Sequence, residues 1–215
     1  MLCLEHQKIR NRRAMVLELK NDVDLYRSGD LCLDDFTGKA TCIARALERS
    51  LTLLPAFNEA CDTARSFVTS ASQPVFSRQF HGCRHYSISL VGIHPKSRIP
   101  VHDHPSMVSL FHVIEGRVQA THYDIFDQSG QNAFVQLASC SGKVLEKGDA
   151  VITMPDIGNL HSLQALDSNA VCLTLQLYAR QEREPRSWYF PLASGRRSNT
   201  ALWYRIQDKE ICNGI

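Results

Sequence analysis

The chain has 215 residues, with 24 Lys and Arg against 22 Asp and Glu, nine His and eight Cys. A net charge of +2 argues against nucleic-acid binding, because such domains usually concentrate a much larger basic excess on one face. No stretch approaches the ~20 apolar residues of a transmembrane helix, and no apolar run of roughly 7 to 15 residues follows the basic N-terminal residues as in a signal peptide. We therefore expect a cytoplasmic protein with no nucleic-acid or membrane partner.

The first 70 residues are predicted to be helical. Apolar residues recur at helical spacing over 41–54 and again over 55–69, and Pro55 can end the first of these helices and open the second. The two apolar stripes consist of Ile43, Leu47, Leu51 and Leu54, and of Phe57, Cys61, Ala64 and Val68. A helix pair is therefore expected before residue 70.

After Tyr86 the apolar residues alternate with a period of two, which is typical of half-buried strands. Short strands separated by turn residues, without alternating helices, favour a sandwich or barrel over a parallel α/β sheet. The predicted strands are 87–93, 108–114, 117–126, 133–138, 143–146, 150–154, 160–166 and 170–178. We expect a helical segment, 1–70, packed on a β unit, 71–215, with the two together forming one structural domain.

The eight cysteines do not point to a metal or disulfide framework. No pair has C-x-x-C spacing, and nothing else in the chain is typical of a secreted protein. We expect most of them to be buried thiols that pack as small apolar side chains.

The histidines carry the strongest local signal. His102 and His104 flank Asp103, and residues i and i+2 of an extended segment point to the same face, so the pair can present two imidazoles to one ion. His161 follows a Pro-Gly turn and can supply a third ligand if the sheet curls into a barrel. The other histidines are expected to be structural: His6, His81, His85, His94, His112 and His122. Of these, His112 and His122 are the main alternatives as metal ligands, because they lie on strands near the motif.

The two histidine segments resemble the motifs of the cupin superfamily, G-x5-HxH-x3-4-E-x6-G and P-x-G-x2-H. Gly116 and the segment Gly158–His161 match these motifs, whereas the usual glutamate ligand falls at Ser109. The resemblance implies a cupin-type β-barrel, that is, a double-stranded β-helix or jelly roll. A three-histidine site without a protein anion leaves three faces of an octahedral metal open and keeps the full charge of the ion.

Within the cupins, the chain resembles the thiol dioxygenases, especially the cysteine dioxygenase family. Four segments carry this resemblance: Phe76-Ser77-Arg78, His102-Asp103-His104-Pro105, Ile157-Gly158-Asn159-Leu160-His161 and Thr174-Leu175-Gln176-Leu177-Tyr178. The H-D-H-P segment is also similar to the cysteamine and plant cysteine oxidases. The resemblance implies Fe(II) as the cofactor, with His102, His104 and His161 as its ligands.

The resemblance also implies roles for residues beyond the metal. Arg78 falls where the family grips the substrate carboxylate, a bidentate task that suits a guanidinium, although a surface salt bridge is the competing interpretation. Ser109 falls at the position that in some members is the cysteine of a Cys-Tyr crosslink, which a serine cannot form.

A third group of candidates lies on the last predicted strand. Thr174, Gln176 and Tyr178 share one strand face, and the family usually shows a histidine where this chain has Gln176. We expect Tyr178 to orient the sulfur or the oxygen intermediate, and Gln176 to hold the Tyr178 hydroxyl without titrating. A polar, solvated strand face is the alternative.

These observations lead to the hypothesis of an Fe(II)-dependent thiol dioxygenase that adds both atoms of O2 to the sulfur of cysteine or a similar small thiol to give a sulfinate. The partners are then the thiol and O2. The rivals are a dioxygenase for cysteamine, 3-mercaptopropionate or N-terminal cysteine, a cupin that binds Zn, Ni or Mn without oxygenase activity, and a structural barrel with surface histidines. The native thiol and the oligomeric state stay open.

Overall fold

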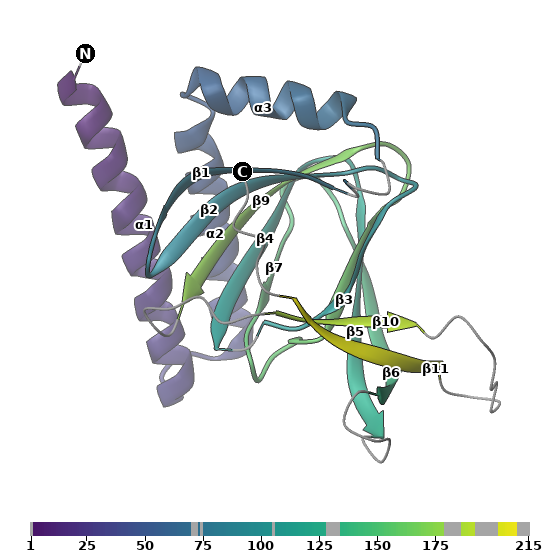
Figure 1. Ribbon diagram of the computed structural model, residues 1–215. Coiled ribbons are helices and arrows are strands. Elements are labelled where there is room, and N and C mark those ends of the chain that lie inside the picture. The colour runs from purple at the N-terminus through teal and green to yellow at the C-terminus, as the bar shows by residue number, and fades with distance from the viewer. Residues whose placement is uncertain are drawn as a thin grey trace.

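The computed structural model describes residues 2–69, 73, 75–104, 106–127, 134–178, 186–191 and 202–209. Within these ranges, three helices come first: α1 (Leu2–Ser28), α2 (Leu33–Leu51) and α3 (Pro55–Ser66) (Figure 1). The strands that follow are β1 (Val75–Cys83), β2 (Tyr86–Ile93), β3 (Arg98–His102), β4 (Met107–Glu115), β5 (Val118–Asp127), β6 (Phe134–Leu145), β7 (Ala150–Thr153), β8 (His161–Ala165), β9 (Ala170–Tyr178), β10 (Arg186–Pro191) and β11 (Leu202–Lys209).

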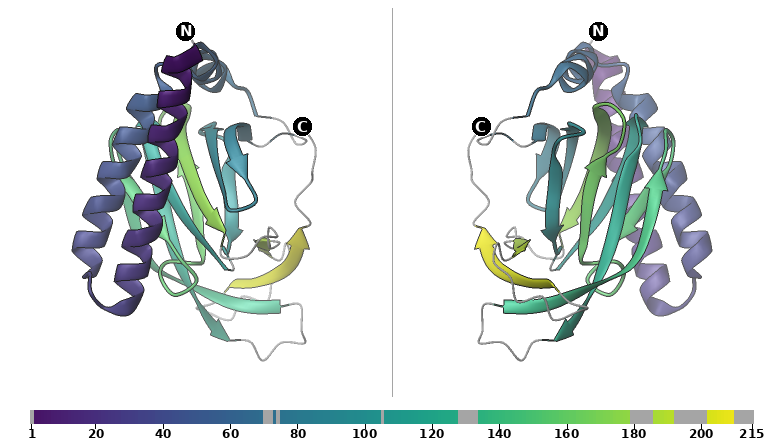
Figure 2. Two further views of the ribbon diagram at one scale, coloured as in Figure 1. Left: turned by 90° about the vertical axis from the view of Figure 1, so that its left-hand side faces the viewer. Right: turned by 90° about the vertical axis from the view of Figure 1, so that its right-hand side faces the viewer.

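The strands form two groups. One is a five-stranded sheet in the order β1-β2-β9-β4-β7, and in the other β10, β11, β6, β5, β8 and β3 close into a barrel. Helices α1 and α2 lie side by side across the outer face of the five-stranded sheet, and α3 lies near one end of it (Figure 2). The prediction of a mainly β barrel with an N-terminal helical segment packed on the β unit is confirmed.

The helices form where apolar spacing and local capping favour them. The Sγ atom of Cys32 accepts a hydrogen bond from the backbone N–H of Asp35 at the start of α2, and Pro55 stands in the first turn of α3. Ile43, Leu47 and Leu51 of the predicted stripe are buried on α2, whereas Leu54 lies beyond the end of the helix and is half-buried. The helix begins at Leu33 rather than near residue 41. The prediction for Val68 was wrong, because α3 ends at Ser66 and Val68 is 76% exposed.

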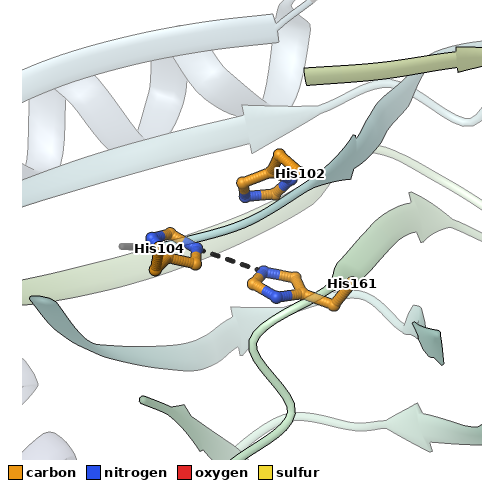
Figure 3. A group of neighbouring side chains, drawn as sticks. All are labelled: His102, His104 and His161. Carbon is orange, nitrogen blue, oxygen red and sulfur yellow. Dashed lines mark hydrogen bonds between the residues drawn. The ribbon is translucent and has the colours of Figure 1, made fainter. Parts of the chain in front are cut away.

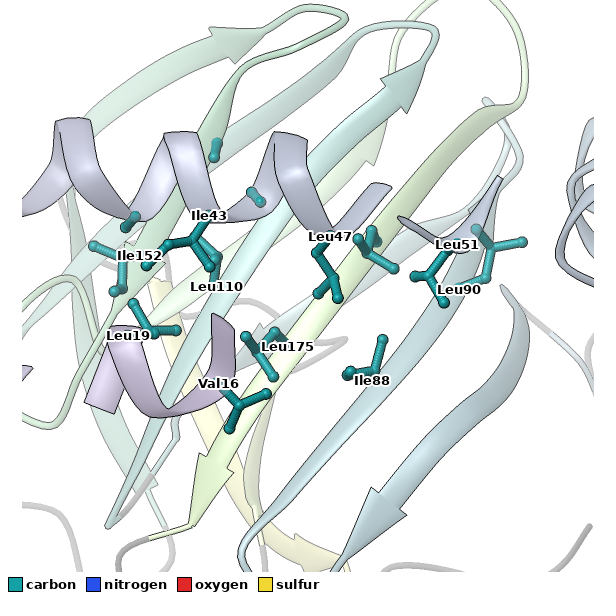
Figure 4. Packing of buried hydrophobic residues seen from close by; sticks show 14 of the residues in the cluster. Val16, Leu19, Ile43, Leu47, Leu51, Ile88, Leu90, Leu110, Ile152 and Leu175 are labelled. Atoms are coloured by element: carbon teal, nitrogen blue, oxygen red, sulfur yellow. The ribbon is translucent and has the colours of Figure 1, made fainter. Parts of the chain in front are cut away.

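Alternate residues of the central strands face two separate apolar layers. Leu110 on β4 packs with the helices (Figure 4), as does Leu173 on β9. Phe111 and Cys172 point to the other face, into the barrel, and pack there with other apolar side chains. Because β4 is buried on both faces, its sequence is nearly continuously apolar. The helices thus cover the outer face of the sheet and leave its inner face to line the barrel interior.

Two polar contacts fix the helices on this sheet. The ring of His112 on β4 bridges the carboxylate of Glu48 on α2, at 2.7 Å from Nε2, and the carbonyl oxygen of Asp149, at 3.0 Å from Nδ1. The side-chain amide of Asn169 donates to carbonyl oxygens at the end of α3, including that of Phe67 at 2.7 Å. His112 therefore has the structural role expected from the sequence.

The cysteine prediction was wrong for most of the described residues. Only Cys61 and Cys172 are buried; the exposed ones are Cys32, Cys42, Cys83 and Cys140, and all six are free thiols. Burial raises the pKa of the Cys172 thiol, which opposes its ionisation. Among the helices that the structure describes, none combines the length and apolar character needed to cross a membrane.

Candidate metal centre

Three buried histidines converge at one end of the barrel interior. His102 ends β3, His161 opens β8, and the two are direct partners in the antiparallel pairing of these strands. His104 lies just after β3, in the loop that leads to β4, and not within an extended strand as expected. Their exposed fractions are 3%, 2% and 5%, and their possible ligand atoms all lie within 4.8 Å of one another (Figure 3). The structure therefore brings the predicted triad together.

A backbone or side-chain acceptor faces the Nδ1 atom of each ring. Nδ1 of His102 lies 2.9 Å from the carbonyl oxygen of Pro100, and Nδ1 of His161 lies 3.3 Å from that of Asn159. A carbonyl only accepts, so both Nδ1 atoms carry hydrogen and donate. For His104 the neighbour is the Sδ atom of Met107 at 3.3 Å, a weak acceptor that favours the same tautomer. All three rings can therefore present an unprotonated Nε2 to an ion.

The distance between two of these Nε2 atoms tests whether a cation fits. Nε2 of His104 and Nε2 of His161 lie 3.4 Å apart (Figure 3). In the tautomer with hydrogen on both Nδ1 atoms, both Nε2 lone pairs are available to one metal ion placed between them. Three neutral imidazole nitrogens are a suitable donor set for Fe, Zn, Ni or Cu. The arrangement thus fits a divalent transition metal.

Asn159 joins the two histidine segments, and the sequence analysis did not assign it a role. Its Oδ1 accepts the backbone N–H of His104 at 2.6 Å, while its own carbonyl accepts from the ring of His161. Its position two residues before His161 was the only available sign, because the bond to His104 spans 55 residues and depends on the fold. Asn159 therefore positions two of the three candidate ligands.

Two glycines of the matched motifs have backbone conformations that favour glycine at their positions. Gly116, at the turn between β4 and β5, has φ of +80°, and Gly158 has φ of +54°. A Cβ atom at Gly158 would come within 2.9 Å of the His122 ring. The centroid of that ring lies 6.1 Å from the centroid of the His161 ring, and the two rings are tilted by 54°. Glycine thus allows His122 to pack behind the triad, outside the three-residue group.

The triad opens onto a small cavity of about 140 Å³. The strand pairing places Ser109 between Gln176 and Thr153, so three uncharged polar side chains form a row across the inner face of the sheet. The complete lining is Ser77, Ser89, Val91, Ile99, His102, His104, Ser109, Phe111, Val151, Thr153, His161, Leu163, Thr174 and Gln176. Among these described residues, none is an Asp, Glu, Lys or Arg. The cavity therefore offers hydroxyl and amide dipoles but no side-chain counterion.

Ser109, Thr174 and Gln176 thus line the cavity, whereas Tyr178 lies outside its lining, next to Gln176. The Tyr178 hydroxyl is 2.8 Å from Oγ of Ser87 and donates to Oε1 of Gln176 at 3.3 Å. Ser87 faces Gln176 across the β2–β9 pairing and also donates to Oε1. Tyr178 contacts the site through Gln176. Sequence reasoning missed Ser87, because only the strand register brings it to this position.

Arg78 lies on the other face of the sheet, which corrects the role that the resemblance implies for it. Arg78 pairs with Leu90, whose side chain packs with the helices, while the preceding Ser77 lines the cavity. Its guanidinium is exposed and lies over the ring of Phe80, 5.7 Å from the centroid. Because side chains alternate along a strand, Ser77 and Arg78 cannot both face the histidines. Arg78 therefore cannot bind the carboxylate of a substrate in the histidine cavity.

The Cys172 side chain lies inside the barrel, but it is too far from Tyr178 along β9 to form a crosslink with it. Six residues of extended chain separate them, or about 20 Å. Neither Ser109 nor Cys172 therefore supplies a cysteine partner for a crosslink to Tyr178.

Comparisons with known proteins agree with these observations. A family model described as PCO_ADO matches residues 44–196. A protein of Dictyostelium discoideum, named as a probable 2-aminoethanethiol dioxygenase, is 28% identical over 93 residues, which are 42% of this chain and 43% of that protein. The chain thus matches less than half the length of this relative.

Similar solved structures are distant in sequence. A protein with a double-stranded β-helix domain from Klebsiella pneumoniae has 13% identity and a TM-score of 0.41, covering 55% of this chain and 90% of that one. A cupin superfamily protein from Desulfitobacterium hafniense has 15% identity and a TM-score of 0.38, covering 54% and 86%.

Proposed function

Since this chain belongs to the PCO_ADO family, we propose that it is an iron-dependent thiol dioxygenase, which adds both atoms of O2 to the sulfur of a small thiol to give a sulfinate. The observation that carries the proposal is the convergence of three buried histidines on one small, uncharged cavity. A surface histidine cluster on a structural barrel would not need this burial.

In this proposal His102, His104 and His161 hold Fe(II) through their Nε2 atoms. When bound, the iron supplies open positions for a thiolate and O2 and favours the ionised thiol. The chain itself keeps the three rings in one tautomer through the acceptors at their Nδ1 atoms, and it excludes bulk water by burying the site. Cytoplasmic reducing conditions would suit both the free thiol and ferrous iron.

The volume of the cavity supports a small substrate. A cavity of about 150 Å³ accommodates benzene, with six heavy atoms. The cavity here, at about 140 Å³, is of that size, and 2-aminoethanethiol together with O2 also has six heavy atoms. The fit is therefore close for an aminothiol.

The charge of the cavity favours a thiol without a carboxylate. Burying a carboxylate without a cationic partner is costly, and Arg78 lies on the opposite face of the sheet. We therefore propose 2-aminoethanethiol, the compound in the name of the Dictyostelium relative, as the preferred substrate type, ahead of cysteine and 3-mercaptopropionate.

Gln176 is proposed to act on the sulfur-bound oxygens. The hydroxyls of Ser87 and Tyr178 engage its Oε1 atom, which leaves the amide N–H groups as donors on the cavity side. Donors at that place stabilise the negative charge that the sulfinate carries. Tyr178 is then a positioning residue that holds Gln176, rather than a residue that touches the sulfur.

The test is O2 consumption by protein loaded anaerobically with Fe(II), with 2-aminoethanethiol, cysteine and 3-mercaptopropionate as alternative thiols. We expect the highest kcat/KM with 2-aminoethanethiol, since the other two carry a carboxylate. A preference for cysteine would overturn the substrate assignment, and no uptake with any thiol would favour a metal-binding cupin without oxygenase activity.

A pair of variants tests the ligand assignment separately. His161→Ala should lose both stoichiometric metal and activity while retaining the fold by circular dichroism, because it removes one of three donors. His122→Ala is the matched control, since His122 packs beside the triad but outside it, and should keep one metal per chain. Metal retained at one per chain in His161→Ala would contradict the assignment.

A further inference from the structure

A second and larger cavity, of about 730 Å³, lies beside the histidine cavity, in a groove between α1 and the ends of β2, β4 and β9. Val16, on the side of α1 that faces the sheet, lines this cavity (Figure 4). We call this cavity the α1 groove. Its lining is Arg13, Val16, Leu17, Lys20, Val23, Asp24, Arg27, Cys83, His85, Tyr86, Ser106, Met107, Val108, Leu177 and Tyr178.

The α1 groove and the histidine cavity share a thin wall. Met107 lines the groove, and its Sδ atom lies 3.3 Å from Nδ1 of His104. Tyr178 also lines the groove, and its hydroxyl donates to Gln176 of the histidine cavity. One side chain thus separates a ligand in the groove from the candidate metal centre.

The rim of the groove on α1 is basic. Arg13, Lys20 and Arg27 recur every seven residues, which puts them on one helix face about 10 Å apart. All three side chains belong to exposed residues, and Asp24 is the one carboxylate among the described lining residues. Arg13 is hydrogen-bonded to Tyr86, whereas no ion pair within the described part of the chain engages Lys20 or Arg27. Two cations are therefore available to a ligand.

The floor between these cations is apolar. Val16, Val23 and Met107 are buried there, and Leu17 is 59% exposed beside them. A large exposed leucine beside a basic row favours a ligand that carries both apolar and acidic side chains.

The spacing of the cations along the groove suits an extended chain. The stretch from Arg13 to Arg27 covers about 21 Å along the helix axis. An extended chain at about 3.3 Å per residue passes one cation every third residue.

We propose that the α1 groove binds an extended, acidic polypeptide segment of another protein, with apolar side chains on the groove floor and carboxylates on Lys20 and Arg27. This inference goes beyond the proposed function, since binding in the groove needs neither metal nor turnover. It makes the groove a docking site next to the candidate metal centre.

The test is fluorescence anisotropy with a labelled peptide of about nine residues that has glutamate at every third position and leucine or serine between. The double variant Lys20→Glu/Arg27→Glu should bind this peptide at least about tenfold more weakly, because two attractions become repulsions. The matched control is Lys96→Glu/Lys147→Glu, which makes the same charge change at exposed lysines outside the groove and should keep the affinity. Raising NaCl from about 0.1 M to about 1 M should weaken binding to the unaltered protein.

Equal binding of a peptide with lysine in place of glutamate, equal losses in the two double variants, or no binding at all would each overturn the proposal. Oxidation of 2-aminoethanethiol by Lys20→Glu/Arg27→Glu is measured alongside and should equal that of the unaltered protein. Failure of the groove proposal is therefore distinguishable from failure of the proposed dioxygenase function.

Discussion

Asn159 provides a sharp test of how the fold supports the candidate metal centre. Asn159→Ala removes the Oδ1 acceptor at 2.6 Å from the backbone nitrogen of His104, but it leaves the carbonyl oxygen that faces His161. The substitution therefore disconnects one histidine segment from the other without deleting a candidate ligand.

The magnitude follows from the loss of that acceptor. His104 is 2% exposed, so its N–H is left without its Asn159 partner in a buried position. Loss of one such bond costs about 1–3 kcal/mol. That cost falls on the free energy of unfolding. Separately, loss of a group that orients a metal ligand typically weakens metal binding by about 10- to 100-fold, which corresponds to about 1.4–2.7 kcal/mol.

The assay is an anaerobic titration with Fe(II), or with Co(II) as a spectroscopic probe, together with thermal unfolding of the metal-free protein. Asn169→Ala is the matched control, because its side chain also donates across the fold, to carbonyl oxygens at the end of α3, and belongs neither to the histidine group nor to the lining of the histidine cavity. We expect Asn169→Ala to lower the Tm while leaving metal affinity unchanged. If Asn159→Ala binds the metal as tightly as the unaltered protein, the positioning role of Asn159 is refuted.

Three further predictions follow from the structure. Arg78→Ala should leave the ratio of kcat/KM for cysteine and 2-aminoethanethiol within about twofold of its original value, and a selective loss with cysteine would return Arg78 to the site. His112→Ala should lower the free energy of unfolding by about 3 kcal/mol in urea titrations, and by more than Glu48→Gln, whose amide can still meet the ring; equal effects would contradict this. The hydrogen bond from Arg65 lowers the pKa of Glu115, so the pair stabilises the fold above the ordinary glutamate pKa and this contribution disappears as the pH falls through the lowered value. Glu115→Gln should therefore show a smaller fall in Tm between about pH 6 and pH 3, and an unchanged fall would refute the link.

The fold class could be predicted because its main elements carry strong periodic signals. The stripes of α2 and α3 and the alternation in β2, β5 and β9 are visible in the sequence and are present in the structure. Helix α1 was missed as a distinct element, since its residues are mostly polar and only a few of them face the core. The strands β1, β3, β10 and β11 were missing from the predicted strands as well, and the predicted strands 133–138 and 143–146 form the single strand β6.

The histidine triad could be predicted because its signal is local. The spacing of His102 and His104, and the glycine before His161, are properties of short segments. Arg78 was predicted wrongly for a physical reason: a shift by one residue in a strand moves a side chain to the opposite face, and the sequence does not determine that register. Asn159, Met107 and Ser87 depend on contacts between distant segments, so only the fold reveals them.

Oxidation of 2-aminoethanethiol by Fe(II)-loaded protein in isotopically labelled O2, followed by mass analysis of the product, shows whether the protein is a thiol dioxygenase. We expect one sulfinate for each O2 consumed, with both oxygen atoms derived from O2. A disulfide, or a product whose oxygen comes from water, would contradict it.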